Sequence, residues 1–223
     1  MNTHRSLTDV AYDHLKGAII SGQIPAGAQV DAKEISSDLG VSRTPVREAI
    51  LRLANEKIVE VTSRRGIRVL PLSVDDLYAT YQVITALEVE AVFLLSAQAD
   101  RSKGVQAVTQ AIAEMDKTVK ANDGEAWNLA DEAFHRAILE YCGNPRLARA
   151  GLGFRDIAQR AHFVALRLVP ISQKAASIDA HRELVDKIRQ GDAYNARESH
   201  RTQRSRGAEL LVAALRELRL AQL

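Results

Sequence analysis

The sequence is poor in the residues that stabilise small secreted or β-rich proteins. Its 223 residues include one cysteine, Cys142, 12 glycines and only 4% aromatic residues. A single cysteine excludes an intrachain disulfide and disfavours cysteine-rich zinc modules, and so few aromatic residues disfavour a β-rich fold. No run approaches the roughly 20 apolar residues of a membrane span, and Met1–Val10 lacks the apolar core of a secretory signal. We therefore expect a reduced, cytoplasmic protein with no membrane partner.

The net charge of the chain is also close to zero. The chain has 30 basic and 28 acidic residues, a formal net charge of +2. Bulk charge therefore gives no argument for nucleic acid, and any basic surface that binds it must be local. Residues 41–70 contain seven Lys and Arg against three Glu, a net charge of +4. This segment is the candidate basic surface.

The first 72 residues predict short helices followed by a hairpin. The predicted helices occupy roughly residues 10–20, 31–39 and 42–53, and β-prone runs at 58–62 and 67–70 flank a turn. Asp31 and Ser42 are the expected N-caps of the second and third helices, and Gly40 ends the second. This order of elements is the plan of a winged helix-turn-helix, in which the third helix enters the major groove of DNA.

The start of the third helix and the hairpin tip carry the polar groups that DNA requires. The candidate DNA-contacting residues are Ser42, Arg43, Thr44 and Arg47 on the helix, with Arg64, Arg65 and Gly66 at the tip. Arg43 and Arg47 lie one turn apart and share a face. Arginine can bind guanine bidentately or hold a phosphate. The alternative interpretation is a solvated basic helix beside a surface hairpin.

Residues 73–223 predict helices only. The segment Pro71–Ser73 is the expected boundary, which gives a domain at 1–72 and a second at 73–223. Six long helical patterns with short connections predict an antiparallel all-α bundle. A break near Gly151–Gly153 would raise the number to seven. The predicted fold class is therefore mainly α, a winged helix-turn-helix followed by this bundle.

The segment Gly40–Ala49 has a specific resemblance. Its sequence, GVSRTPVREA, followed by Arg64-Arg65-Gly66, resembles the N-terminal DNA-binding domain of the GntR family of bacterial transcription regulators. The resemblance implies that Arg43 and Arg47 contact DNA, that Lys33 on the preceding helix contributes, and that the wing enters the minor groove. One departure is Lys57, where the family usually has glycine at the end of the helix.

The helical part contains residues that could hold a metal. Asp131 and His135 lie four residues apart on one predicted helix and so point the same way, while His181 and His200 lie on later helices. Carboxylate and imidazole groups facing one bundle interior suit a divalent first-row metal such as zinc or nickel. By spacing alone, surface histidines or satisfied core histidines are the simpler explanation of the pattern.

A second resemblance covers this part of the chain. The runs DEAFHRAIL from Asp131 and HRELVDKIRQGDA from His181 are similar to the metal-binding segments of the FCD domain, the FadR-type C-terminal domain of GntR regulators. The resemblance implies that Asp131, His135 and His181 are metal ligands. The family's last histidine falls at Gln203, so His200, Gln203 or water could complete the site. The metal could also be lost.

The effector is less constrained by the sequence. The family often has arginine at the position of Ile84, where it can meet an acidic effector, and Ile84 removes that charge. Gln203, Arg155 and Arg160 are the candidate effector contacts, and His162 is a further residue that could compensate for Ile84. The expected effector is a small molecule, with an organic acid as one candidate.

Three functional hypotheses follow. The leading one is a homodimeric, ligand-responsive transcription regulator that binds double-stranded operator DNA and is not an enzyme. The second is a DNA-binding dimer whose helical domain is a degenerate, metal-free sensor. The third is a metalloenzyme, against which stands the lack of a His-Glu-x-x-His motif or a phosphate-binding glycine loop.

Overall fold

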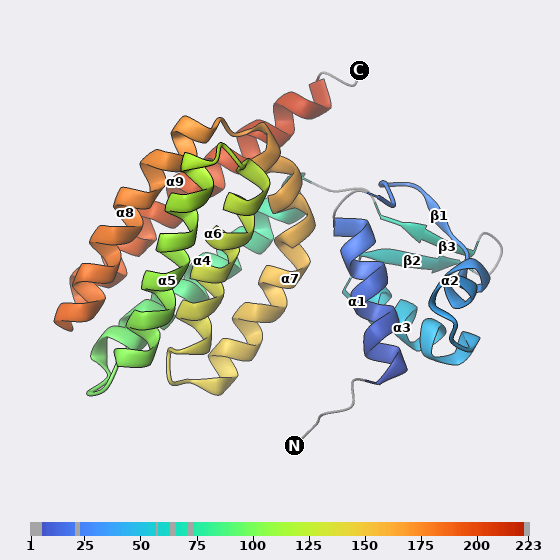
Figure 1. Cartoon of the computed structure of the whole chain (residues 1–223), viewed down its shortest axis with the longest axis horizontal. Helices are drawn as coiled ribbons and strands as arrows, with labels where there is room; N and C mark the ends of the chain where they lie inside the picture. Colours follow the sequence, from blue (N-terminus) through green and yellow to red (C-terminus); the bar gives the residue numbers. More distant parts are fainter. Residues whose placement is uncertain (1–5, 21–22, 57, 63–65, 71–73, 221–223) are drawn as a thin grey trace. The chain divides into compact units, whose positions relative to one another are not determined.

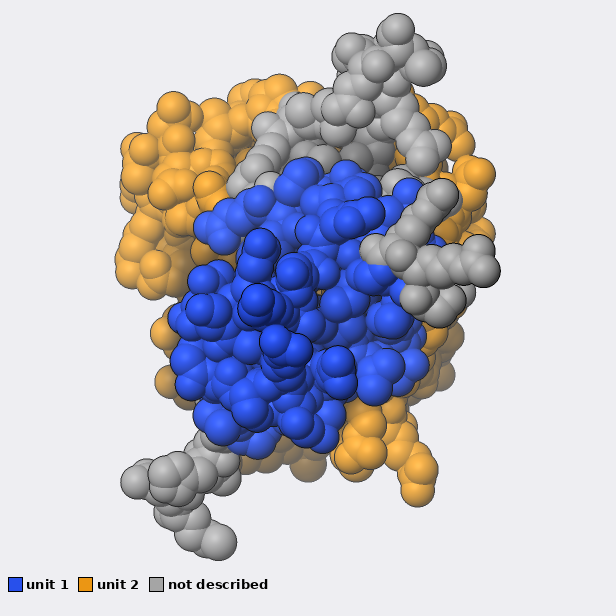
Figure 2. Space-filling view, turned by 90° about the vertical axis from the view of Figure 1, so that its right-hand side faces the viewer, with its two compact units in different colours: residues 1–73, 159–161 blue, residues 74–158, 162–223 orange. Residues whose placement is uncertain are grey.

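The computed structural model of the chain describes residues 6–20, 23–56, 58–62, 66–70 and 74–220. The chain divides into two compact units, residues 1–73 with 159–161 and residues 74–158 with 162–223, which Figure 2 colours separately. We call the described part of residues 6–70 the N-terminal unit, and residues 74–158 and 162–220 the helical unit. Each is described by itself.

The described residues of the N-terminal unit form three helices and a small sheet (Figure 1). Its elements are α1 (Leu7–Ile20), β1 (Gln29–Val30), α2 (Ala32–Leu39), α3 (Arg43–Asn55), β2 (Val59–Thr62) and β3 (Gly66–Val69). All pairings are antiparallel in the order β1-β3-β2, and Thr62 pairs with Gly66 at the end of the hairpin. The predicted winged helix-turn-helix is confirmed, and β1 is an addition that the sequence pattern did not predict.

Helix ends in this unit follow from local chemistry. The Asp31 side chain caps α2 by accepting a hydrogen bond from the Lys33 backbone N–H at 2.7 Å. Gly40 ends α2 in the left-handed conformation, with φ +63°, which glycine adopts without a steric penalty. Ser42 occupies the N-cap position of α3, but its side chain makes no capping hydrogen bond. The Ser42 hydroxyl is therefore not committed to holding the helix.

The core of the N-terminal unit explains why α3 presents one face outward. Val46, Ala49, Ile50 and Leu53 are buried on α3, with the helical spacing that the apolar pattern predicts. They pack with buried residues of α1, such as Leu15, and of the strands. The opposite face of α3 is left exposed.

The helical unit contains six helices in its described residues, α4 to α9 (Figure 1). They are α4 (Val74–Ala97), α5 (Ser102–Lys120), α6 (Gly124–Glu140), α7 (Pro145–Leu168), α8 (Ile171–Gln190) and α9 (Ala193–Leu220). Helix α7 runs unbroken through Gly151 and Gly153, so the bundle has no seventh helix at that point. The closest helix pairings are α4 with α9, and α5 with α6 and α8.

Helix α4 is the central apolar helix of this unit. It is long and apolar enough to cross a membrane by length and composition alone. However, it packs against α9, α6 and α8, and it buries Tyr81, Ile84, Glu88 and Val92 among other side chains. These contacts are those of a core helix in a bundle.

Candidate nucleic-acid interface and candidate metal centre

The exposed face of α3 carries the predicted DNA-contacting side chains. Ser42, Arg43, Thr44 and Arg47 are all exposed, as are Lys33 on α2 and Gly66 in the wing. Gly66 has φ +74°, a backbone conformation that favours glycine. Arg64 and Arg65 lie outside the described residues.

The arginines of α3 and the wing differ in their partners. Arg52 donates to Asp9 at 2.8 Å and stacks over the Tyr12 ring at 4.0 Å, and Arg68 donates to Glu60 at 2.8 Å. Within the described residues, Arg43 and Arg47 have no ion pair and no hydrogen bond from their guanidinium groups. These two side chains are therefore available to an external anion or base edge.

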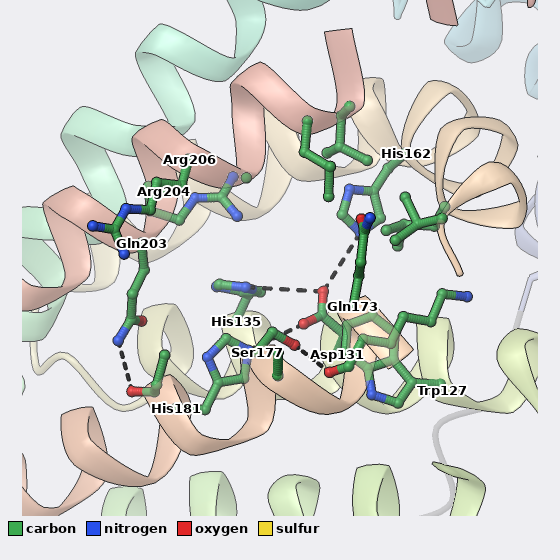
Figure 3. Close-up of a pocket in the computed structure, with 18 residues that line it drawn as sticks. Trp127, Asp131, His135, His162, Gln173, Ser177, His181, Gln203, Arg204 and Arg206 are labelled. Carbon is green, nitrogen blue, oxygen red and sulfur yellow. Dashed lines mark hydrogen bonds and ion pairs between the residues drawn. The ribbon is translucent and has the colours of Figure 1, made fainter. Parts of the chain in front are cut away.

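The helical unit encloses a cavity of about 380 Å³ lined by residues of α6, α7, α8 and α9 (Figure 3). Asp131 lies in its wall with three imidazoles turned toward it. Asp131 Oδ1 is 3.1 Å from His181 Nε2, and Asp131 Oδ2 is 3.5 Å from His162 Nε2 and 3.9 Å from His135 Nε2. One carboxylate thus faces histidines from three different helices.

Burial and the neighbouring side chains together set the protonation of this cluster. Burial raises the pKa of Asp131, but the nearby imidazoles of His162 and His181 outweigh it and hold this pKa well below its usual range. Burial lowers the pKa of His135 to about 3. The resulting groups are a carboxylate and a neutral imidazole, which are the forms that bind divalent metals.

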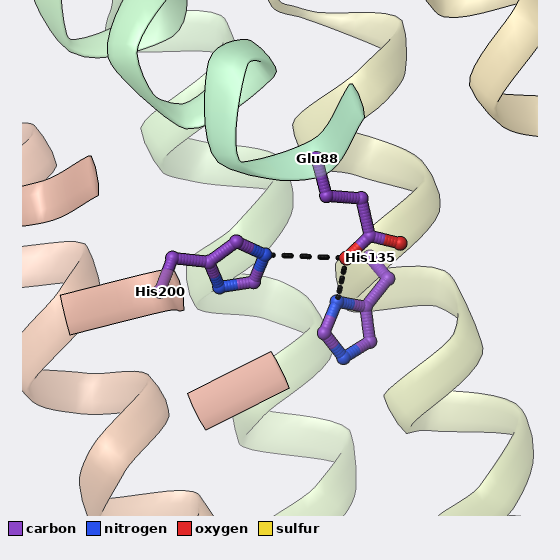
Figure 4. Close-up of side chains that lie close together, drawn as sticks. All are labelled: Glu88, His135 and His200. Carbon is purple, nitrogen blue, oxygen red and sulfur yellow. Dashed lines mark hydrogen bonds and ion pairs between the residues drawn. The ribbon is translucent and has the colours of Figure 1, made fainter. Parts of the chain in front are cut away.

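A second cluster lies on the other side of His135 (Figure 4). The Glu88 carboxylate of α4 is fully buried, and its Oε2 lies 3.0 Å from His135 Nδ1, 3.2 Å from His200 Nε2 and 3.3 Å from Arg204 Nε. Burial raises the pKa of Glu88, yet Arg204, His135 and Arg155 outweigh it and keep this pKa well below its usual range. Glu88 therefore stays ionised and favours a proton on His135 Nδ1, which leaves the lone pair of Nε2, on the side of Asp131, available to a metal ion.

The structure separates the predicted site residues into two groups. Asp131, His135 and His181 come together, with their ligand atoms all within 4.8 Å of one another. His200 lies instead with Glu88 and shares only His135 with the first group.

The candidate effector contacts also separate. Gln203 lines the cavity, and its amide donates to the Ala180 carbonyl at 2.6 Å. Arg155 is 4% exposed and pairs with Glu88 and Glu132, and it is not among the residues that line the cavity. The side chain of Arg160 lies outside the described part of the chain. Of the three candidates, Gln203 is the one that the structure places in the cavity wall.

Sequence reasoning did not place His162 and Glu88 in these clusters. A signal for His162 was present, because Ala158, His162 and Leu166 recur every four residues on α7 and all three are buried. A histidine within a buried stripe of a bundle helix faces the interior. Glu88 also lies on a buried face of α4, but only the fold shows which side chains meet it.

The donor set fits a divalent metal ion. Carboxylate and imidazole groups are the ligands that first-row metals such as zinc and nickel accept. Buried ring nitrogens also remain without hydrogen-bond partners among the described residues, including His162 Nε2 and His181 Nδ1. Unpartnered buried polar atoms are costly, and a bound ion is one explanation for them.

The fold and these two sites define a class of protein, the DNA-binding regulator with a helical ligand-binding domain. Comparison of sequences identifies the family. Residues 7–69 match the family described as "Bacterial regulatory proteins, gntR family", and residues 79–203 match the "FCD domain". The chain belongs to the GntR family of bacterial transcription regulators, in its FCD branch.

Individual relatives agree with this assignment. An HTH-type transcriptional regulator of Agrobacterium vitis is 35% identical over 132 residues, 58% of this chain and 77% of the relative. The "Probable D-xylose utilization operon transcriptional repressor" of Paenarthrobacter nicotinovorans is 31% identical over 192 residues, 85% of this chain and 82% of the relative. The solved structure of E. coli McbR/YncC, a protein 20% identical in sequence, matches with a TM-score of 0.80 over 93% of this chain and 97% of that one, so it shares the fold. The two sequence relatives are named as regulators, which confirms a regulator over the metalloenzyme alternative.

Proposed function

We propose that this regulator binds operator DNA as a homodimer in the cytoplasm, through α3 and the wing, and that a small molecule in the α6–α9 cavity changes its affinity for DNA. The observation that carries the DNA contact is the pair of exposed guanidinium groups of Arg43 and Arg47 on one face of α3, which have no ion pair with any described residue. Lys33, Ser42 and Thr44 lie exposed at the same end of the helix-turn-helix. In a dimer, two such helices would read half-sites one helical turn apart.

The cavity supports a small organic anion as effector. A volume of about 380 Å³ suits a small molecule. Arg204 lines the cavity, and its Nη2 has no hydrogen-bond partner among the described residues. A carboxylate is the natural partner of such a guanidinium. Apolar lining from residues such as Trp127, Leu166 and Leu211 would hold the rest of the effector.

A divalent metal such as zinc or nickel belongs to this proposal. Asp131, His135 and His181 would hold it, and the ion would supply a positive charge that attracts an anionic effector. Effector and metal would favour one arrangement of the bundle, and the segment 71–73 that joins the units would pass that preference to the DNA-binding helices. This mechanism requires the effector to bind the two arrangements with different affinities.

The DNA contact is tested with arginine variants of the full chain. The DNA is a duplex that wild-type protein selects from a random-sequence pool, and binding is measured by fluorescence anisotropy. Arg43→Ala and Arg47→Ala should each lower affinity by at least about 1–3 kcal/mol, roughly 5- to 150-fold, the range for one arginine–guanine contact. Arg52→Ala is the matched control, because Arg52 already pairs with Asp9 on the protein itself. Wild-type affinity in both alanine variants of Arg43 and Arg47 would refute the assigned recognition helix.

Metal analysis separates this proposal from the metal-free sensor. Wild-type protein that is stripped of metal and reloaded should hold zinc, and His135→Ala should not. The absence of bound zinc in the wild type would favour a helical domain that serves only to dimerise.

A further inference from the structure

Asp131, His135 and His181 give three protein ligands for a metal ion. The side chain that would supply a fourth ligand is still to be identified. His200 is directed to the Glu88 carboxylate at 3.2 Å and is not among the residues lining the cavity. Gln203 does line the cavity, where its amide nitrogen donates to the Ala180 carbonyl and its buried Oε1 has no hydrogen-bond partner among the described residues. An amide oxygen, however, is a poorer ligand for zinc than an imidazole. Neither side chain offers an imidazole to Asp131.

His162 of α7 does offer one (Figure 3). Its side chain is 5% exposed, and Nε2 lies 3.5 Å from Asp131 Oδ2, a long contact, with no other hydrogen-bond partner among the described residues. On the other side of the ring, Nδ1 bonds to the hydroxyl of the buried Tyr81. Tyr81 thereby fixes the ring so that Nε2 is directed at Asp131, as outer partners of metal-ligating histidines do.

The arrangement of His162 parallels that of His135. Each imidazole has one nitrogen near a residue of α4, Glu88 for His135 and Tyr81 for His162. Each turns its Nε2 to Asp131. A buried imidazole nitrogen whose single contact among the described residues is this long is poorly satisfied, which costs free energy unless something binds it. His162 therefore has the features of a metal ligand.

We propose that His162 is the fourth protein ligand of the metal, so that the donor set is Asp131, His135, His162 and His181. This inference rests on the proposed metal site and names its composition. The ligands then come from α6, α7 and α8 alone. The α9 side chains Gln203 and Arg204 are left to contact the effector.

The experiment measures zinc binding to full-length protein that has been stripped with a chelator. Zinc content is measured by mass spectrometry, and affinity by competition with a chromophoric chelator. We expect one zinc per wild-type chain. His162→Ala should lower affinity at least 100-fold, which exceeds the roughly 10- to 100-fold loss expected from an outer partner such as Tyr81 in Tyr81→Phe. His14→Ala is the matched control, because His14 is exposed on α1.

Two further measurements separate ligation from a folding defect. X-ray absorption of the zinc-loaded protein should count three imidazoles in the wild type and two in His162→Gln, a variant that can still hydrogen-bond to Tyr81. Adding Gln203→His to His162→Ala should restore zinc affinity, because position 203 lines the same cavity. Circular dichroism verifies the helical content of each variant.

The outcomes are distinct. Loss of zinc in His135→Ala together with wild-type affinity and three imidazoles in His162→Gln would overturn the assignment of His162 and leave the metal site standing. The assignment of His162 would also be overturned, with the metal site intact, if His200→Ala removed an imidazole from the zinc and His162→Ala did not. Wild-type protein that takes up no zinc would overturn both the ligand assignment and the metal site.

Discussion

Arg155→Met should destabilise the helical unit strongly. Arg155 is 4% exposed and donates to two buried carboxylates, Glu88 and Glu132. Burial lowers the pKa of Arg155, but the two glutamates outweigh it and raise this pKa well above its usual value. Methionine keeps the length of the side chain and leaves both carboxylates without this guanidinium. Removing one partner of a buried ion pair costs about 3–5 kcal/mol, which lowers the melting temperature of a unit of this size by about 6–20 °C.

Chemical denaturation of chelator-treated protein measures this loss, with circular dichroism as the signal. Arg182→Met is the matched control, because Arg182 pairs with Asp116 and Asp179 while its side chain is 47% exposed. Such a surface pair contributes up to about 1 kcal/mol. Adding Glu132→Gln to Arg155→Met should recover part of the loss, because it removes a stranded charge. An Arg155→Met protein with wild-type stability but no response to effector would refute this reasoning. It would indicate that Arg155 contacts the effector.

Three other predictions follow from single features of the structure. Gly40→Ala should lower the free energy of unfolding by about 1–2 kcal/mol in urea denaturation, because Gly40 has φ +63°; unchanged stability would contradict a left-handed cap. Ser42→Ala should change the free energy of unfolding by less than about 0.5 kcal/mol, because the Ser42 hydroxyl makes no capping hydrogen bond. The same variant should weaken operator binding in anisotropy titrations. A loss of about 1 kcal/mol, typical of a missing N-cap, would show instead that this hydroxyl caps α3. Chelation should lower the melting temperature of zinc-loaded wild type, by the equivalent of about 4 kcal/mol when free zinc exceeds its Kd 1000-fold, and should leave His135→Ala unchanged.

Much of the fold was predictable because its signals are local. Apolar residues recur with helical spacing along α1 and α3, and glycine at 40 marks the turn between α2 and α3. The hairpin was predicted from two β-prone runs around a turn. Strand β1 was not, because it has only two residues, Gln29 and Val30, and alternation cannot be recognised over two positions.

The candidate site was predictable only where it lies on one helix. Asp131 and His135 share a face because they are four residues apart. His200 and Gln203 are three residues apart on α9, and at about 100° per residue they differ by roughly 60° around the helix. That difference separates them: His200 meets Glu88, while Gln203 lines the cavity.

The remaining features of the site depend on contacts between segments that are far apart in the sequence, so they could not be predicted from local patterns. Arg155 resembles a surface charge in a polar stretch of α7, and only the packing of α4, α6 and α7 brings it against Glu88 and Glu132. His162 could be placed on the buried stripe of its helix, but its approach to Asp131 depends on how α7 lies against α6.

The most direct test of the account is the affinity of the full-length wild-type protein for its selected operator, measured in zinc-loaded and in chelator-stripped form at one salt concentration. Coupling between two sites in a protein typically changes affinity by about 5- to 150-fold. We predict a difference within that range, and we predict that His135→Ala abolishes it. Equal operator affinity of the loaded and stripped wild-type protein would contradict the claim that the Asp131 site controls DNA binding.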